Sequence, residues 1–270
     1  MALAVCATPI GNLEDVTLRV LRELGEADLV LAEDTRHSKG LLDRHGVRAT
    51  LVSYHRHNEA QRIAELLPRL LAGERIALVS DAGLPGVNDP GARLIAAALE
   101  AGVPVTVLPG PSAVETALVA SGLAGDRFQF LGYLPRGEQA LAALWESLRA
   151  WEFPAVAFES PRRLPAALRS LAAVQPDRPV AVCRELTKRF EEVVRGPAAV
   201  VAARFAEPPK GEITLVLGGA AAPAGDAGEA VAAVSELVGA GVPRRQAADL
   251  VARLTRLSRN TLYAESLKSG

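Results

Sequence analysis

The chain has 270 residues, of which 49% are hydrophobic and 23% charged, and its formal net charge is −1. This length suffices for one to three domains, and the nearly neutral charge excludes a polycation that binds nucleic acid over its whole surface. Only two cysteines occur, no secretory leader is recognisable and no run of about 18 apolar residues is present, so we expect a soluble, cytoplasmic protein without disulfides or a membrane segment.

The first half of the chain alternates short apolar runs with helical patterns. Strand-like runs, each followed by a segment with helical spacing, lie at 3–9, 28–34, 49–55, 75–80 and 103–109. Such alternation is typical of β-α units in a mainly parallel sheet. Because ligands bind beyond the carboxyl ends of the strands in sheets of this kind, the loops after the strands are the candidate site.

Three of these loops, at 7–15, 80–91 and 108–115, are rich in glycine and proline. Any one of them is explained by turn geometry alone, but three at one sheet edge favour a ligand. The middle loop, SDAGLPGVNDPG, holds Asp81 and Asp89 but no lysine, and neither common glycine-rich phosphate motif is present. Since the two aspartates repel polyphosphates, a ligand with cationic and hydroxyl groups, such as S-adenosylmethionine, suits this loop better.

Two capping patterns predict where helices begin. Ser112 and Glu115 form the S-x-x-E pattern of a capping box. Asp89 followed by Pro90 is typical of an N-cap residue and the first helical position. Both patterns place the start of a helix directly after a loop of the candidate site.

Two polar stretches follow other strands of the first half. LAEDTRHS contains the adjacent carboxylates Glu33 and Asp34, which can serve as a base, as metal ligands or as a helix N-terminus. In YHRHN, His55 and His57 fall on one face of a strand, but no third ligand has suitable spacing, so we expect no metal. Arg56 instead favours a loop that faces RNA or another substrate.

A second series of strands with fewer intervening helices starts near residue 126. Its strand-like runs lie at 127–135, 154–160, 179–186, 191–196 and 212–218. The interval between CREL and EEVVRG is too short for a crossover helix, which predicts an antiparallel pair. In FESPRRL, Glu159 is a candidate base or polar anchor, and Arg162 and Arg163 either meet phosphates or begin a capped helix. Surface ion pairing explains much of the charge around Lys188. In PPKGEITLVL, a flexible lead-in carries Lys210 and Glu212, which can close over a ligand.

The end of the chain differs in composition. A linker of Gly, Ala and Pro at 218–228 precedes two short predicted helices, one with an apolar stripe that begins at Ala247 and one that starts at Ser258. Residues 241–270 carry six basic and two acidic side chains, a net charge of about +4, which favours contact with nucleic acid. The six basic residues are Arg244, Arg245, Arg253, Arg256, Arg259 and Lys268.

Taken in order, these stretches resemble the tetrapyrrole methylase superfamily of S-adenosylmethionine-dependent enzymes, and within it the branch that methylates small-subunit ribosomal RNA. The matching stretches are ATPIGNLEDVTLR, AEDTRHS, SYHRHNE, SDAGLPGVNDPG, VLPGPSAVETALVASGL, FLGYLPR, FESPRRL, CRELTKRFEE and KGEITLVLGG. The LYAESLK end is similar to the helix-turn-helix extension of that branch. The resemblance covers nearly the whole chain.

The resemblance implies an α/β protein with the two-domain, class III S-adenosylmethionine methyltransferase fold. Such a fold has a mainly parallel N-terminal sheet, a mixed C-terminal sheet and a small helical C-terminal extension. The corresponding divisions of this chain are 1–121, 122–219 and 226–270. The resemblance also implies a homodimer with the cofactor in the cleft between the two α/β domains.

The activity that the resemblance implies is methyl transfer to the 2′-hydroxyl of cytidine 1402 of 16S rRNA, in the small ribosomal subunit. Carried over residue by residue, the cofactor contacts are Pro9, Asp81, Ala82, Gly83, Leu84, Ser112, Ala113, Phe158, Leu186, Gly211, Glu212, Ile213 and Thr214. Methyl transfer of this kind needs positioning and a base within reach of the hydroxyl, without a metal. The candidate catalytic residues, three acids for the base and two cations for flanking phosphates, are Glu33, Asp34, Glu159, Arg36 and Lys188.

Two other functions remain open at the level of the sequence. A methylase of the same superfamily could act on a tetrapyrrole or another small metabolite, although a small substrate needs no basic helical tail. A ligand-sensing helix-turn-helix protein without catalysis is the second alternative. Several strand-end loops that face one cleft favour an enzyme over a sensor.

Overall fold

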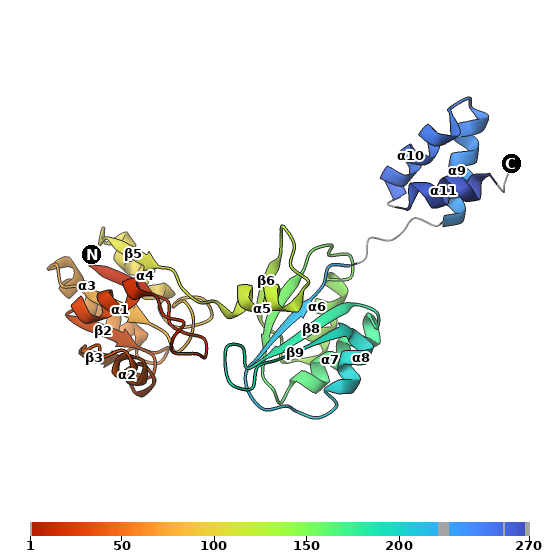
Figure 1. The fold of residues 1–270 in the computed structure, drawn as a ribbon. Coiled ribbons are helices and arrows are strands. Elements are labelled where there is room, and N and C mark those ends of the chain that lie inside the picture. Colours follow the sequence, from red (N-terminus) through yellow and green to blue (C-terminus); the bar gives the residue numbers. More distant parts are fainter. Residues whose placement is uncertain (1, 221–226, 256, 268–270) are drawn as a thin grey trace.

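The computed structural model describes residues 2–220, 227–255 and 257–267, which form two five-stranded sheets and a C-terminal group of helices (Figure 1). The strands of the first sheet are β1 (Leu3–Cys6), β2 (Leu29–Ala32), β3 (Leu51–Ser53), β4 (Ile76–Val79) and β5 (Val105–Leu108). Their order is β3-β2-β4-β1-β5, and every pairing is parallel. The predicted parallel sheet is therefore confirmed.

Helices cover both faces of the first sheet. They are α1 (Leu18–Glu26), α2 (Thr35–Arg44), α3 (Glu59–Leu71) and α4 (Ala92–Glu100). Alternate strand residues face opposite layers: Leu31 and Leu78 pack in a core with α3 and α4, whereas Ala32 and Val79 pack in a core with α1 and α2. Because neither face of the central strands meets water, these strands are apolar at every position.

The second sheet is mixed, as expected. Its strands are β6 (Gln129–Tyr133), β7 (Ala155–Glu159), β8 (Pro179–Arg184), β9 (Glu192–Pro197) and β10 (Ile213–Leu217), in the order β6-β7-β10-β8-β9. Only the β6–β7 pairing is parallel. The antiparallel β8–β9 pair confirms the prediction made from the short interval between the two strands.

The two faces of the second sheet are covered by different parts of the chain. Helices α6 (Glu138–Ser147), α7 (Leu164–Val174) and α8 (Ala198–Arg204) share a core with one face. On the other face lies α5 (Ala113–Ser121), where Ala117 and Leu118 pack with Val156 and Val216. Helix α5 follows β5 directly, so the chain leaves the first sheet and packs on the second before residue 122. That crossing brings the strand-end loops of the first sheet to the second sheet.

Both capping predictions need correction. Helix α4 begins at Ala92, and its N-cap is Gly91 rather than Asp89, because a backbone turn with φ of 131° at Gly91 separates the aspartate from the helix. Helix α5 does begin after Ser112. The Ser112 hydroxyl, however, donates a hydrogen bond to the Glu115 carboxylate and accepts none from a helix amide, so the capping box does not form.

The C-terminal helices form a separate core. They are α9 (Ala227–Gly239), α10 (Arg244–Thr255) and α11 (Arg259–Ser266), and buried Val234, Val251 and Leu262 pack together among them. The two predicted helices are confirmed. Helix α9 was not predicted, because its sequence resembles that of the Gly- and Ala-rich linker. Most of that linker, 221–226, lies outside the described residues. Among the described residues, no helix is both long and apolar enough to cross a membrane.

Candidate functional site

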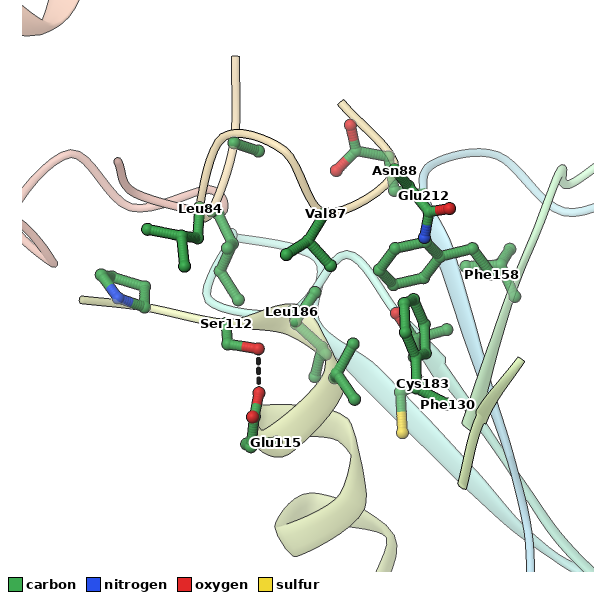
Figure 2. Close-up of a pocket in the computed structure, with 18 of the residues that line it drawn as sticks. Leu84, Val87, Asn88, Ser112, Glu115, Phe130, Phe158, Cys183, Leu186 and Glu212 are labelled. Carbon is green, nitrogen blue, oxygen red and sulfur yellow. Dashed lines mark hydrogen bonds between the residues drawn. The ribbon is translucent and has the colours of Figure 1, made fainter. Parts of the chain in front are cut away.

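A cavity of about 850 Å³ lies where the strand-end loops of the first sheet meet one face of the second sheet (Figure 2). Its wall includes eleven of the thirteen residues predicted to bind the cofactor: Ala82, Gly83, Leu84, Ser112, Ala113, Phe158, Leu186, Gly211, Glu212, Ile213 and Thr214. Thus predicted residues up to 132 positions apart in the sequence, from Ala82 to Thr214, line one cavity.

Backbone geometry shapes the wall on the side of the first sheet. Thr8 and Gly83 exchange two backbone hydrogen bonds, of 2.8 and 3.0 Å, which fasten the loop after β1 to the loop after β4. Gly83 has a φ of 74°, a conformation that glycine adopts without steric cost. The Thr8 hydroxyl also donates to the Ser80 carbonyl at 3.0 Å. This wall is consequently set by main-chain conformation more than by side-chain size.

Side chains on neighbouring strands form the wall on the side of the second sheet. Thr214 on β10 lies opposite Phe158 on β7 and Cys183 on β8, so the three side chains share one face of the sheet. The Phe158 ring packs edge-on against the rings of Phe130, at 5.1 Å between centroids, and Tyr133, at 5.6 Å. Figure 2 shows the two labelled phenylalanines next to each other in the wall.

The cavity is acidic. Four carboxyl side chains line it, those of Asp89, Glu115, Glu159 and Glu212, and its described lining contains no lysine, arginine or histidine. Burial raises the pKa of Asp89 above its ordinary value, opposed by a hydrogen bond from Ser80. An anionic phosphate would be repelled here, whereas a cationic ligand would be attracted.

A clamp around Lys188 holds the loop after β8 against both halves of the site. The Lys188 ammonium donates to Glu185 at 2.9 Å and to Glu212 at 2.8 Å. Burial alone would lower the pKa of Lys188, but the two hydrogen bonds outweigh it and raise that pKa. A Cβ atom at Gly11 would lie 2.6 Å from Cγ of Lys188, and the Asn12 amide donates to the Thr187 hydroxyl at 3.0 Å. Lys188 is therefore part of a packed junction, which does not support the predicted contact with an RNA phosphate.

A smaller cavity of about 240 Å³ adjoins the first. The two share Ile10, Ala82 and Glu212 as lining residues. Pro9 and Asp81, the two predicted cofactor contacts absent from the large cavity, line the small one. The predicted contacts are thus divided between two adjoining cavities.

The three candidate acids lie in different environments. Asp34 caps α2 by accepting from the Arg36 amide, and the Arg36 side chain lowers the pKa of Asp34 to about 2. This arrangement matches the alternative of a helix N-terminus, and it makes Asp34 a weak base. Neither Asp34 nor Arg36 lines either cavity.

Glu159 lines the large cavity but is buried. It accepts from the Ser160 amide at 2.7 Å and lies 3.1 Å from the Arg163 guanidinium, which also donates to the carbonyls of Leu134 and Pro135. Burial raises the pKa of Glu159, although the Ser160 amide and Arg163 oppose that shift. The contacts support the interpretation of Glu159 as a polar anchor.

Glu33 lies at the end of β2, outside both cavity linings. Burial and the nearby charges of Asp89 and Asp81 raise its pKa, while Arg56 lowers it. Arg56 also donates to the carbonyl of Asn88, so it ties the loop after β4 to the loop after β3. Arg56 is thus engaged within the protein.

The two histidines of YHRHN lie with ring centroids 5.9 Å apart. Across the described parts of the chain, no group of three His, Cys, Asp or Glu side chains is arranged to hold a metal ion. His55 and His57 line neither cavity.

Several lining residues were not predicted from the sequence, above all Phe130, Tyr133, Cys183 and Val87. The strands that carry the first three were recognised, but which face of a sheet borders a cavity depends on strand pairing. Asn88, whose φ is 63°, also lines the cavity. Alternation within RFQFLGY was the one available signal for Phe130.

Four of the six basic residues of the tail fall within the described chain. Arg244 donates to the Ser266 carbonyl, and Arg253 pairs with Asp249 at 3.3 Å. Arg245 and Arg259 are exposed, while Arg256 and Lys268 lie outside the described residues.

Comparison with known proteins gives consistent similarity over most of the chain. The family model described as Tetrapyrrole (Corrin/Porphyrin) Methylases matches residues 2–202. Proteins named ribosomal RNA small subunit methyltransferase I are similar in sequence: that of Thermotoga maritima is 43% identical, over 80% of this chain and 98% of its own length. That of Micromonospora olivasterospora is 43% identical over 97% and 85%, and that of Synechocystis sp. 42% over 98% and 97%.

Solved structures support the same fold. Uroporphyrin-III C-methyltransferase from Thermus thermophilus, complexed with S-adenosyl homocysteine, matches with a TM-score of 0.56 and 21% identity, over 80% of this chain and 96% of that one. The methyltransferase CobJ matches with a TM-score of 0.61 and 21% identity, over 81% and 94%. At this level of identity the match concerns the fold alone.

Proposed function

Since the chain belongs to the tetrapyrrole methylase family and is an S-adenosylmethionine-dependent methyltransferase, we propose that it methylates the 2′-hydroxyl of cytidine 1402 of 16S rRNA in the small ribosomal subunit. The observation that carries this proposal is the large acidic cavity. Both sheets contribute residues to it, and its described lining contains no basic side chain. The names of the similar proteins support ribosomal RNA as the substrate.

The cavity fits the cofactor. Its volume of about 850 Å³ lies in the range of small-molecule sites, and its mixed apolar and acidic wall suits an adenosyl group that bears a sulfonium and an ammonium. When bound, S-adenosylmethionine supplies a methyl group on a positively charged sulfur. We propose that the thirteen predicted contacts form its site, eleven of them in the large cavity and Pro9 and Asp81 where the small cavity adjoins it.

The protein's own contribution to the reaction is mainly positioning. The loop after β4 is fixed by its hydrogen bonds to Thr8, and the loop after β8 by Lys188. The hydrogen bond from the Asn12 amide to the Thr187 hydroxyl joins the two halves of the site. Holding the donor and the acceptor hydroxyl in line replaces a bimolecular encounter, which supplies a large part of the rate enhancement. Of the original candidate bases, Asp34 and Glu159 are engaged elsewhere, and Glu33 lies outside both cavity linings.

The C-terminal helices supply the proposed contact with RNA. Arg245 and Arg259 are exposed on α10 and α11, where they can approach phosphates. A cytoplasmic location and a homodimer also belong to the proposal. The location follows from the few cysteines and the lack of a recognisable leader in the sequence, and the homodimer from the resemblance to the family.

The test is methyl transfer from a tritiated donor to 30S subunits, to free 16S rRNA and to a tetrapyrrole such as uroporphyrinogen. Label in the small subunit or its RNA, with a reverse-transcription stop at position 1402, is the expected result. Label in the tetrapyrrole alone would identify the small-metabolite methylase instead. No label in any acceptor, combined with cofactor binding, would favour the ligand-sensing protein.

The role of the tail is measured separately. Arg245→Glu with Arg259→Glu should weaken binding to 30S subunits about tenfold, because two attractive phosphate contacts become repulsive, and should leave cofactor affinity unchanged. The matched control reverses charge on the opposite part of the molecule, at exposed Arg22 on α1. Equal effects of the two variants on 30S binding would exclude the tail as the RNA contact.

A further inference from the structure

The small cavity has a composition that the proposed cofactor site does not explain. It is bounded by the loop after β1, by the side chains of His37 and Ser38 on α2, and by Asp81 at the end of β4. The Lys188 clamp forms the opposite rim. With about 240 Å³ against 850 Å³, it is far too small for a second cofactor and large enough for one sugar ring.

Ser38 is a buried polar group without a partner. Its residue exposure is 5%, and its hydroxyl oxygen has no hydrogen bond within the described structure. A buried hydroxyl without a partner destabilises a fold by roughly 1–3 kcal/mol, so such groups usually face water or a ligand. Since Ser38 lines the small cavity, any ligand in that cavity meets a hydroxyl that can both donate and accept.

Asp81 offers a second polar contact in the same cavity. One of its oxygens, Oδ1, accepts from the Asp34 amide at 3.0 Å, which fixes the orientation of the carboxyl group. A carboxylate has two oxygens, so Oδ2 keeps its capacity to accept. Ala82, the next residue, lines both cavities, so Asp81 lies next to the place where the two cavities adjoin.

The charges of the small cavity select among ligands. Lys188 is neutralised by Glu185 and Glu212, so the only cationic ammonium on the described rim has two carboxylate partners already. Together with Asp81, the carboxylates outnumber this cation, which disfavours a phosphate. A neutral group with hydroxyls that donate and accept, such as a ribose, matches Ser38 and Asp81.

We propose that the small cavity receives the ribose of the acceptor nucleotide. The Ser38 hydroxyl forms a hydrogen bond with a ribose hydroxyl, and Asp81 accepts the proton of the attacking 2′-hydroxyl. The proposal rests on the proposed function. In the step, a bond forms between the ribose 2′-oxygen and the methyl carbon while the carbon–sulfur bond breaks and its electron pair stays on sulfur. The hydroxyl proton passes to the Asp81 carboxylate, so the positive charge of the donor and the negative charge of Asp81 are lost together.

The experiment compares Ser38→Ala with the wild type in the full chain. Because Ser38 has no partner to lose, its thermal stability should be equal or higher, and the affinity for S-adenosylhomocysteine by calorimetry should stay within twofold. Single-turnover methyl transfer to 30S subunits should fall about tenfold. The matched control is Ser147→Ala, which removes an exposed hydroxyl far from both cavity linings and should leave all three measurements unchanged.

Asp81→Asn tests the second contact. The amide oxygen can still accept from the Asp34 backbone, so the loop should keep its conformation. Because Asp81 is also a proposed cofactor contact, the affinity for S-adenosylhomocysteine is measured beside the rate and should fall far less than the rate. Loss of the proton acceptor should lower the single-turnover rate about 100-fold. A cofactor affinity that falls by the same factor as the rate would instead make Asp81 a cofactor contact only, and would overturn its role here.

The two proposals fail in different ways. If the wild type labels RNA and Ser38→Ala does so at an unchanged rate, the ribose site is wrong while the proposed function stands. If the wild type labels neither 30S subunits nor 16S rRNA, the proposed function is wrong and the ribose site falls with it.

Discussion

The two sheets build their halves of the large cavity by different means. The first sheet contributes loops beyond its strand ends, with a backbone bridge between Thr8 and Gly83. The second contributes the side chains of Phe158, Cys183 and Thr214 from one face of adjacent strands. A backbone wall is sensitive to φ at its glycines, whereas a side-chain wall is sensitive to volume. Equivalent substitutions should therefore act through different physical routes in the two halves.

The largest effect is expected when the side-chain wall gains volume. Thr214→Phe places a ring on β10 between Phe158 and Cys183, where it extends into the cavity. We expect cofactor affinity, measured by calorimetry, to fall at least 100-fold because the ring occupies the ligand's space. The same face of the sheet packs on α5 at Val216, so the melting temperature of the variant is measured together with its affinity.

The control for Thr214→Phe is Thr214→Val, which keeps the shape of the side chain and removes its hydroxyl. Its cofactor affinity should stay within about threefold of the wild type. If Val reduced affinity as strongly as Phe, the hydroxyl rather than the volume would matter, and the second sheet would not be a wall defined by side-chain size.

A change of backbone conformation should have the next largest effect. Gly83→Ala adds a Cβ atom with no neighbour closer than 3.9 Å, so the substitution strains φ without a clash. Strain of this kind costs about 1–2 kcal/mol and should shift the loop enough to lower cofactor affinity about tenfold. Gly102→Ala is the matched control, because Gly102 has nearly the same φ of 75° and lies outside both cavity linings. The two variants should lose similar stability, and only Gly83→Ala should lose affinity.

Lys188 lies at the junction between the halves, where both kinds of wall depend on it. Lys188→Met keeps the aliphatic packing against Gly11 but leaves Glu185 and Glu212 without their shared cation. We expect cofactor affinity to fall about fivefold, and Lys188→Arg should recover part of it because the positive charge returns. A merely structural loss would lower the melting temperature without this recovery. Lys39→Met, on the exposed side of α2, is the control.

The residues themselves indicated the loops of the first half of the cavity, whereas the predicted lining residues of the second half, such as Phe158 and Thr214, came from the resemblance to the family. Loops such as SDAGLPGVNDPG can be recognised from their composition, since only unusual backbone geometry requires so many glycines and prolines. The parallel order of the first sheet then places such loops at one edge. Phe130 and Cys183 carry no such signal, because an apolar residue on a strand looks the same whether it faces a core or a cavity.

The roles of the charged residues were harder to predict than their position near the strand-end loops. Asp34, Glu159 and Lys188 are polar residues near the strand-end loops, yet each is held by a partner: Arg36, Arg163 and a pair of glutamates. Most of these partners are only two to four residues away in the sequence, but whether two nearby charged side chains pair depends on the backbone between them, and Glu212 is 24 residues from Lys188. The reverse case, Ser38, attracts attention only because the structure leaves it buried and without a partner.

The smallest expected effect concerns the charge of the backbone wall. Burial raises the pKa of Asp89 in the folded state, so the folded protein binds a proton more tightly than the unfolded chain. The ionised carboxylate thus destabilises the fold above that raised pKa, and the penalty disappears below the ordinary value of 3.8. Asp89→Asn should melt slightly higher than the wild type at pH 8, and the difference should shrink toward pH 3.5. Exposed Asp126→Asn should show no such pH-dependent gain. If the gain in melting temperature of Asp89→Asn were larger at acid pH than at pH 8, the desolvated charge of Asp89 would not be its cause.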